Sequence, residues 1–334
     1  PVLSLSRTVY ERMEYKMRKL KFAGYAALAA VICFAAAGCS SKVKESTAPR
    51  VELTQIKDEV VEPVFDGAEI QVLDLQNPID YSYSSGNADM TFDYREGVWL
   101  DGMDPSIPIN QEKFQAMADN FLQLHAVSEV ELPENLNDYG LGSPAYSLYI
   151  TDSGNGAFDI SIGSQDGAGN YYLLINDSEL YTVLPATVES MVFDYDSLVV
   201  RDGLDLQVAA ADIENAAVTI GRKSVSYDTK DTEAMEKIAD GINHLQASAY
   251  ASYNALEQEL VSAELTEDFR TTFQAEINVN GETRSLVVYV GTAADVDNRQ
   301  RYVQIDGSNM IMLVDTSVVN NLLNMVVEET EAAE

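Results

Sequence analysis

The residues leading to Cys39 are the part of this sequence whose types and order most clearly indicate chemistry. Arg18, Lys19 and Lys21 precede an uncharged, Ala-rich run over residues 22–37, and small residues then lead to Cys39. This order matches the plan of a secretory signal peptide. The apolar run is shorter than the roughly 20 residues that cross a bilayer as a helix. We therefore expect export and cleavage.

The segment Ala36-Ala-Gly-Cys39 resembles the lipobox that bacterial lipoprotein-processing enzymes recognise. The resemblance implies cleavage after Gly38 and acylation of the Cys39 thiol, which would anchor the chain on the extracytoplasmic side of the cell membrane. Ala36 departs from the Leu that is usual at this position, so an ordinary signal peptide or short membrane anchor with an incidental cysteine stays open. We expect residues 1–38 to be the signal peptide and Met17 to be its initiator.

Cysteine and charge counts restrict what the mature chain can do. Cys33 leaves with the signal peptide, and Cys39 alone supports neither a disulfide nor a cysteine-based metal site. Removing the six basic and two acidic residues before Cys39 leaves 15 basic and 52 acidic residues, a net charge of −37. Such a charge repels nucleic acid. The acidic residues are dispersed, which favours a solvated surface over loose binding of divalent cations.

The chain after Cys39 contains an internal repeat. We expect residues 39–76 to hold the lipidated cysteine and a polar tether, in which residues 51–75 allow an edge strand. Helical segments begin at Asn110 and Asp231, 121 residues apart, and both residues are good N-caps. Each segment carries apolar residues at helical spacing: Phe114, Met117, Ala118, Phe121 and Leu122 in one, and Met235, Ile238, Ala239, Ile242 and Leu245 in the other.

Alternating strands surround each helix in the same order. A hairpin precedes it, four strands follow, and a short helix ends each copy. From Tyr172 onward the offset between the copies is constant at 130 residues. The sequence therefore predicts an α+β fold of two tandem repeats, each a largely antiparallel sheet with one long packed helix and a short C-terminal helix. The first repeat covers residues 77–200, a diverged second covers 201–328, and residues 329–334 form an acidic tail.

The first repeat resembles domain of unknown function 4340 (DUF4340), a family found in bacterial lipoproteins. Over residues 77–195 the resemblance is carried by Gly97-Val98-Trp99, the helix over 110–126, the segment Leu136–Pro144, Ile162-Gly163 and Tyr171-Tyr172. In the second repeat, residues 263–269 replace the Tyr-Gly-Leu segment. The family implies no catalytic residues. Some similar domains accompany membrane transport systems, so the resemblance implies an accessory role there as one expectation.

Few residues have the spacing of a catalytic or metal site. His125 and His244 lie late in the two predicted helices, where a boundary position is the usual explanation. No Gly-x-Ser-x-Gly, His-Glu-x-x-His or phosphate-binding Gly-rich motif occurs. The acidic stretches 152–155 and 295–298 resemble calcium loops but lack their distal glutamate, which favours turns. A pair of hydrolytic carboxylates among 52 acids is not singled out by its spacing.

Tyrosines crowd the first repeat, where they could pair across strands or form a recognition surface. They are Tyr81, Tyr83, Tyr94, Tyr146, Tyr149, Tyr171, Tyr172 and Tyr181. We expect strand pairing. Taken together, the residues predict a non-enzymatic binding or assembly module, without cofactor or metal, held at the membrane by lipid on Cys39. Its expected partner is an envelope protein, peptide or glycan; an envelope hydrolase with an acidic site scattered in sequence is the alternative.

Overall fold

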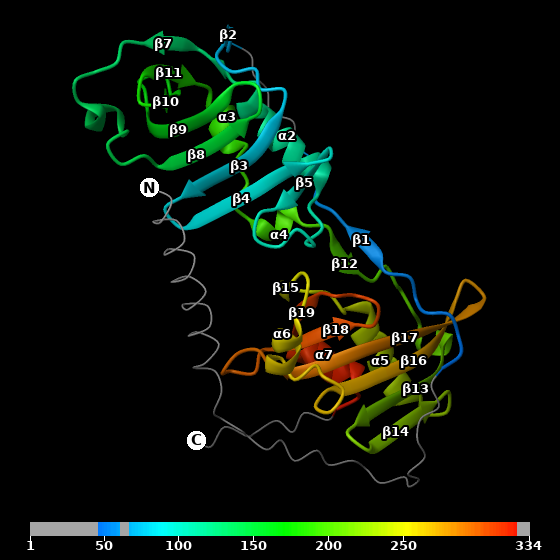
Figure 1. The fold of residues 1–334 in the computed structure, drawn as a ribbon. Helices are drawn as coiled ribbons and strands as arrows, with labels where there is room; N and C mark the ends of the chain where they lie inside the picture. Colours follow the sequence, from blue (N-terminus) through cyan, green and yellow to red (C-terminus); the bar gives the residue numbers. More distant parts are fainter. Residues whose placement is uncertain (1–45, 61–66, 326–334) are drawn as a thin grey trace, which may run out of the picture. The chain divides into compact units, whose positions relative to one another are not determined.

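The computed structural model describes residues 46–60 and 67–325. The chain divides into two compact units (Figure 1). The first unit is residues 55–202, and the second unit is residues 203–334 together with the segment that ends at Thr54. Each unit has an antiparallel sheet with helices packed on it, so the predicted α+β class is confirmed.

The first unit is built on an eight-stranded sheet with the order β5-β4-β3-β8-β9-β10-β11-β7. A second, two-stranded sheet pairs β2 (Ile70–Gln71) with β6 (His125–Ala126). The main strands are β3 (Pro78–Ser85), β4 (Ala88–Arg95), β5 (Val98–Asp101), β7 (Ser128–Val130), β8 (Tyr146–Asp152), β9 (Gly156–Gln165), β10 (Tyr171–Ile175) and β11 (Glu179–Val183). The helices are α2 (Gln111–Leu122), η1 (Leu136–Tyr139), α3 (Pro185–Glu189) and α4 (Tyr195–Leu198).

Helix α2 begins after Asn110, whose side chain accepts a hydrogen bond from the Lys113 backbone N–H. Its buried residues are those of the predicted apolar stripe. The helix ends at Leu122, four residues before the predicted end at Ala126. The cause is Leu124, which is buried and whose carbonyl accepts the N–H groups of Val72 and Leu73, so the chain here pairs with the segment around β2.

Aromatic rings join α2 to the sheet. The Phe114 ring centroid lies 4.1 Å from that of Phe92, 4.9 Å from Trp99 and 5.8 Å from Tyr81. All four side chains are at most 1% exposed. Tightly packed aromatic pairs stabilise beyond the area they bury, by about 0.5–1.5 kcal/mol each. This cluster is therefore the centre of the first unit's core.

The second unit has a seven-stranded sheet with the order β14-β13-β16-β17-β18-β19-β15. Its core joins residues of α5 and α7 to the inner sheet positions, among them Ile238, Phe273 and Leu322. The strands are β13 (Ile213–Ile220), β14 (Lys223–Asp228), β15 (Ala249–Ser252), β16 (Thr271–Val279), β17 (Glu282–Ala293), β18 (Gln300–Ile305) and β19 (Ile311–Asp315). The helices are η2 (Ala210–Asp212), α5 (Thr232–Asn243), α6 (Glu257–Ser262) and α7 (Thr316–Leu322).

The two strand orders correspond place by place once β5 is set aside. β4, β3, β8, β9, β10, β11 and β7 take the positions that β14, β13, β16, β17, β18, β19 and β15 take in the second unit. Helix α2 follows its hairpin as α5 follows β13 and β14. In the second unit residues 229–231 connect β14 directly to α5, so β5 has no counterpart.

A similar turn lies over the outer face of each sheet. In the first unit Gly140 follows η1 with φ 72°, and the Leu141 N–H donates to the Leu136 carbonyl over 3.0 Å. In the second unit Glu264 follows α6 with φ 55°, and the Leu265 N–H donates to Leu260 over 2.8 Å. A residue with a left-handed φ, together with a backbone hydrogen bond from the sixth residue of the turn back to the first, is typical of a Schellman helix C-terminus. Both turns bring a buried leucine, Leu141 or Leu265, onto the sheet.

Each turn touches the sheet at a glycine. A Cβ atom on Gly163 would lie 2.1 Å from the Tyr139 carbonyl oxygen, and one on Gly291 would lie 1.9 Å from that of Ala263. Both distances are far inside van der Waals contact, so only glycine fits. The segment Leu136–Pro144, one of those that carry the family resemblance, thus has a packing role.

The segment from Ser46 to Thr54 packs on the second unit. Ser285 exchanges backbone hydrogen bonds with Pro49 and Val51, and Arg50 Nε lies 2.8 Å from Asp306 Oδ2. Further along, β1 (Thr54–Ile56) pairs with β12 (Arg201–Gly203) in a separate two-stranded sheet. Within the described part of residues 51–75, both β1 and β2 therefore pair outside the two main sheets.

Replacing the contact glycines should destabilise their units. We expect Gly163→Ala and Gly291→Ala each to lower the free energy of unfolding by about 1–3 kcal/mol, because the turn must move away from the sheet. Gly167→Ala is the control, since it has open space around it and no left-handed φ. Urea titration followed by circular dichroism measures the change. Equal stability of Gly291→Ala and Gly167→Ala would contradict the close approach.

Truncating the helix stripes should also be costly. Phe121→Ala and Ile242→Ala should each cost about 2–5 kcal/mol, because both side chains are at most 2% exposed. Trp99 is the single tryptophan and is buried in the first unit, so its fluorescence follows Phe121→Ala. Circular dichroism follows Ile242→Ala, with the exposed Glu236→Ala on the same helix as control. A loss under 1 kcal/mol for either core variant would refute the stripe.

Candidate functional site

The predicted lipidation and cleavage residues, Cys39 and Gly38, lie outside the described residues. Within residues 46–60 and 67–325, no helix is both long and apolar enough to cross a membrane. The same residues contain no group of three or more His, Cys, Asp or Glu side chains able to hold a metal ion.

The histidines lie in different units and both bind backbone carbonyls. His125 is in β6, beyond the end of α2 rather than late in it, and its Nδ1 lies 2.9 Å from the Gln123 carbonyl oxygen. His244 is the C-cap of α5, with Nδ1 2.9 Å from the Asp240 carbonyl oxygen.

The two acidic loops are hydrogen-bonded turns, as favoured from the sequence. Asp152 is buried, and its carboxylate accepts the N–H groups of Asn77, Gly154 and Asn155. Burial opposes the charged form of Asp152, but these bonds prevail and hold the pKa of its carboxyl below the usual range. Asp295 accepts the N–H groups of Arg299 and Gln300, which likewise lower its pKa.

Most of the singled-out tyrosines belong to the packing of the sheet. Tyr81 and Tyr83 are buried in the aromatic core, and the Tyr83 hydroxyl donates to the Val192 carbonyl. Tyr139 and Tyr172 meet edge to face at 4.4 Å under the outer turn. Tyr149 is 49% exposed at the middle of β8, so it is the one of this group most open to solvent.

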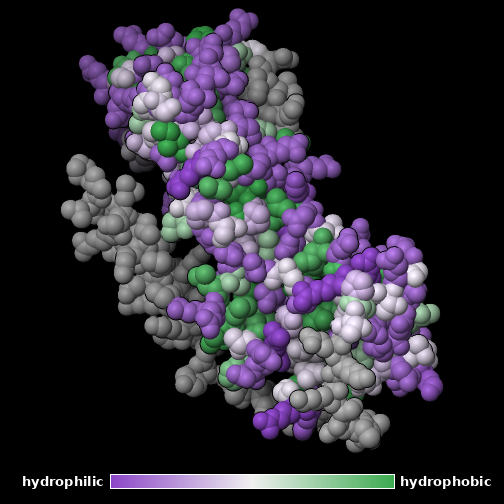
Figure 2. Space-filling view, turned by 45° about the vertical axis from the view of Figure 1, so that its right-hand side comes forward, coloured by the Kyte–Doolittle hydropathy of each residue, from purple (hydrophilic) through white to green (hydrophobic). Residues whose placement is uncertain are grey.

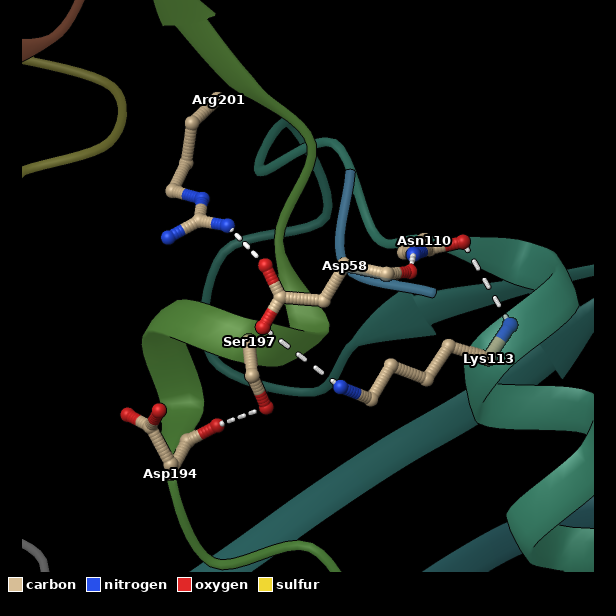
Figure 3. A network of polar contacts seen from close by, with 6 residues as sticks. All are labelled: Asp58, Asn110, Lys113, Asp194, Ser197 and Arg201. Carbon is tan, nitrogen blue, oxygen red and sulfur yellow. Dashed lines mark hydrogen bonds and ion pairs between the residues drawn. The ribbon is translucent and has the colours of Figure 1, made fainter. Parts of the chain in front are cut away.

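A network of ionic side chains meets at Asp58, a residue that the sequence did not single out (Figure 3). The Asp58 carboxylate pairs with Arg201 through one oxygen, and its other oxygen lies 3.6 Å from Lys113 Nζ. Arg201 and Lys113 are 17% and 18% exposed, whereas Asp58 is 38% exposed. The two cations are thus largely withdrawn from water and share one carboxylate.

The backbone around this network is fixed by further hydrogen bonds. Asn110 is 2% exposed and donates through Nδ2 to the Asp58 carbonyl over 3.2 Å, while its Oδ1 caps α2. Figure 3 shows Ser197 donating to the Asp194 carbonyl, over 2.9 Å, on the neighbouring α4. The network therefore joins the entry segment at Asp58 to the start of α2 and to Arg201.

The electrostatic balance of the network limits what it can bind. Burial raises the pKa of Asp196, the negative charge of Asp194 adds to this, and Arg201 opposes it. Asp194 and Asp58 both act electrostatically on Asp196, so three carboxylates outnumber the two cations, both of which already face Asp58. An external anion would have to displace Asp58, so the arrangement acts chemically as an internal ion-pair clamp.

A second polar pair lies close to α4. The Tyr195 hydroxyl donates to Asp101 Oδ2 over 2.6 Å, and Asp101 Oδ1 accepts the N–H groups of Met103 and Asp104. Burial, followed by the hydrogen bond and charge of Asp101, raises the pKa of Tyr195. The tyrosine therefore stays a hydrogen-bond donor, and the pair holds the loop after β5.

Comparison with known proteins finds similarity to one family model and to no protein of known activity. Residues 103–258 match the family model described as Domain of unknown function (DUF4340). The match supports the resemblance read from the sequence. No curated protein and no solved structure matches the chain.

The DUF4340 match differs in extent from the sequence-based estimate of 77–195. It includes α2, the turn at Leu136–Pro144 and the strands β8 to β11, and continues through α5 and β15 of the second unit. Gly97-Val98-Trp99 lies outside it. The matched range therefore begins after β5, the strand that has no counterpart in the second unit.

Neutralising Asp58 should weaken the first unit. We expect Asp58→Asn to lower its free energy of unfolding by about 1–3 kcal/mol, because two poorly solvated cations lose their shared carboxylate. Asp93→Asn is the matched control, since Asp93 pairs with the 63% exposed Arg95 and should cost below about 1 kcal/mol. Urea titration followed by Trp99 fluorescence compares them. If the two variants lose the same stability, Asp58 is no clamp.

Proposed function

We propose that this chain is a lipoprotein, anchored through Cys39 on the extracytoplasmic side of the cell membrane, that acts as a non-catalytic binding or assembly module. The observation that carries the proposal is the order of residues 18–39: basic region, apolar run, small residues and cysteine. An accessory role beside a membrane transport system belongs to the same proposal and rests on the DUF4340 resemblance.

Contacts of the segment after the tether support a defined anchoring geometry. Ser46 donates to Glu276 over 2.6 Å, and this bond, with one from Asn215, lowers the pKa of the Glu276 carboxyl. Ser46 is seven positions after Cys39, and an extended chain of that length spans at most about 25 Å. Lipid on Cys39 would therefore hold the second unit close to the membrane. Confinement at a surface raises the effective concentration of a weakly bound partner.

We further propose that the two units are diverged copies of one domain. The matching strand orders support this, and so do the two outer turns, each with a left-handed residue, a buried leucine and a carbonyl on a sheet glycine. Glu264 stands where the first unit has Gly140, so the second copy keeps the turn geometry with a residue that strains it. Duplication gives two related sheets that can bind a partner.

Binding is favoured over catalysis because the carboxylates described above already interact with groups of the chain itself. Asp58, Asp101, Asp152 and Asp295 are each occupied by N–H groups, a hydroxyl or cations of the chain itself. A general acid or base needs a proton-transfer position facing substrate. These side chains instead act as acceptors that fix turns and segments.

Mass spectrometry of the mature amino terminus tests the anchor. We expect an N-terminal Cys39 carrying acyl chains. Cys39→Ala should release the chain from the membrane and abolish its cellular role, while thermal unfolding stays unchanged because no disulfide is lost. Cys33→Ala is the matched control and should leave localisation intact. An unmodified terminus at any other residue would refute lipidation. A single carboxylate substitution that ends the cellular role without loss of stability would favour the hydrolase instead.

A further inference from the structure

Strand β14 is an open sheet edge in the second unit. It pairs with β13 on one side, and no strand of the described residues pairs with it on the other. Figure 1 shows it at the margin of its sheet. In the first unit the corresponding strand β4 is covered in part, since β5 pairs with Phe92–Arg95. The second unit lacks this cover because the chain runs from β14 straight into α5.

The free hydrogen-bonding groups of this edge can be assigned from the hairpin register. Ile220 and Lys223 form the closing pair of a two-residue turn, which is a hydrogen-bonded pair, and such pairs alternate along an antiparallel ladder. Ser224 and Ser226 fall on the alternate positions, opposite Thr219 and Ala217. Their backbone N–H and C=O groups therefore point away from β13, where an added strand would bind them.

Unpaired cations lie at the turn end of the same edge. Arg222 and Lys223 are exposed and form no ion pair with any described residue. The other cations of the described chain are mostly paired with carboxylates; those so paired are Arg50, Arg95, Lys113, Lys237, Arg201, Arg284 and Arg299. Two adjacent free cations are therefore unusual in a chain with a net charge of −33.

Charges at the opposite end of β14 set a direction. There Asp228 and Asp231 accept backbone N–H groups, and the exposed Lys230 lies between them in sequence. The two carboxylates outnumber the one cation at this end, whereas the turn end carries Arg222 and Lys223. An acidic ligand residue is thus attracted to the turn end of β14 and not to the end beside α5.

We propose that β14 is a strand-addition site for an extended segment of a partner protein whose acidic residues lie beside Arg222 and Lys223. Every pairing within this sheet is antiparallel. An antiparallel partner runs against β14, so its C-terminal half meets the turn and carries the acidic side chains. Backbone bonds to Ser224 and Ser226 supply affinity, and the charges supply register. This deepens the proposed binding function by naming a surface and a partner class.

Edge cations also have an opposite explanation, because lysine on an edge strand often prevents strand addition. The two explanations predict different results when Arg222 and Lys223 are neutralised. If Arg222 and Lys223 attract an acidic segment, neutralising them weakens its binding. If they only guard the edge, neutralising them leaves the acidic segment unbound or promotes association between two copies of the chain.

The test uses the purified full-length chain and a labelled peptide, acetyl-Thr-Val-Thr-Val-Glu-Val-Glu-amide, by fluorescence anisotropy. We expect saturable binding that Arg222→Gln/Lys223→Gln weakens about tenfold, as two exposed ion pairs are lost. Lys57→Gln/Lys237→Gln carries the same charge change elsewhere and should bind as the parent chain does. The peptide with Lys in place of Glu should not bind, and the order-reversed peptide should bind more weakly.

A backbone variant separates strand addition from simple charge attraction. Ser226→Pro removes the outward N–H without breaking a bond to β13, and it should abolish binding, whereas Ser226→Ala keeps the N–H and should bind normally. If Ser226→Pro unfolds, hydrogen exchange of the parent chain decides: the peptide should protect the Ser224 and Ser226 amides. Equal binding by both Ser226 variants, no protection of these amides, no binding of the acidic peptide, or dimerisation of the double Gln variant would overturn the proposal. Lipidation of Cys39 is unaffected by any of these outcomes, so the two proposals fail separately.

Discussion

Each unit depends on one twelve-residue helix that covers one face of its sheet. Phe114 of α2 contacts three aromatic rings from β3, β4 and β5, and Ile238 and Ile242 of α5 join the inner residues of five strands. Beyond Cys39 the sequence has no further cysteine, so no disulfide can supplement this packing. The outer face of each sheet has a smaller cluster under the Leu141 or Leu265 turn, which needs a glycine beneath it. The helix therefore sets the core, and the turn closes the sheet's other side.

Periodicity made the elements of this fold predictable. The apolar stripes of α2 and α5 and the alternating strands around them follow from local patterns, which act over a few residues. The end of α2 was not predictable in this way, because Leu124 is withdrawn from the helix by bonds to Val72 and Leu73. The Asp58 clamp was likewise hidden, since Arg201 is 143 residues away and neither residue belongs to a periodic pattern. Contacts of this kind exist only once the chain has folded.

The glycines of the segments that carry the DUF4340 resemblance have a physical explanation that bears on function. Gly140 adopts a left-handed φ, Gly142 leaves room for the Asn137 side chain, and Gly163 receives the Tyr139 carbonyl. These glycines fix the conformation of the outer turn, so the segments that carry the family resemblance have a structural role. Residues that select a partner are then to be sought where the two units differ. The open β14 edge is such a difference, because the first unit covers part of the equivalent strand with β5.

Charge supports the same location. The carboxylates of the described residues give most of the surface one sign, and Figure 2 shows hydrophilic residues over much of the face in view. A uniformly acidic surface repels acidic segments, and long-range repulsion of this kind lowers encounter rates. A partner strand with acidic residues would therefore be repelled except beside unpaired cations, and Arg222 and Lys223 lie at the turn end of the edge strand whose outward backbone groups are unpaired. The unpaired backbone N–H and C=O groups of this edge supply affinity, and the unpaired cations supply selectivity. Neither feature would supply both alone.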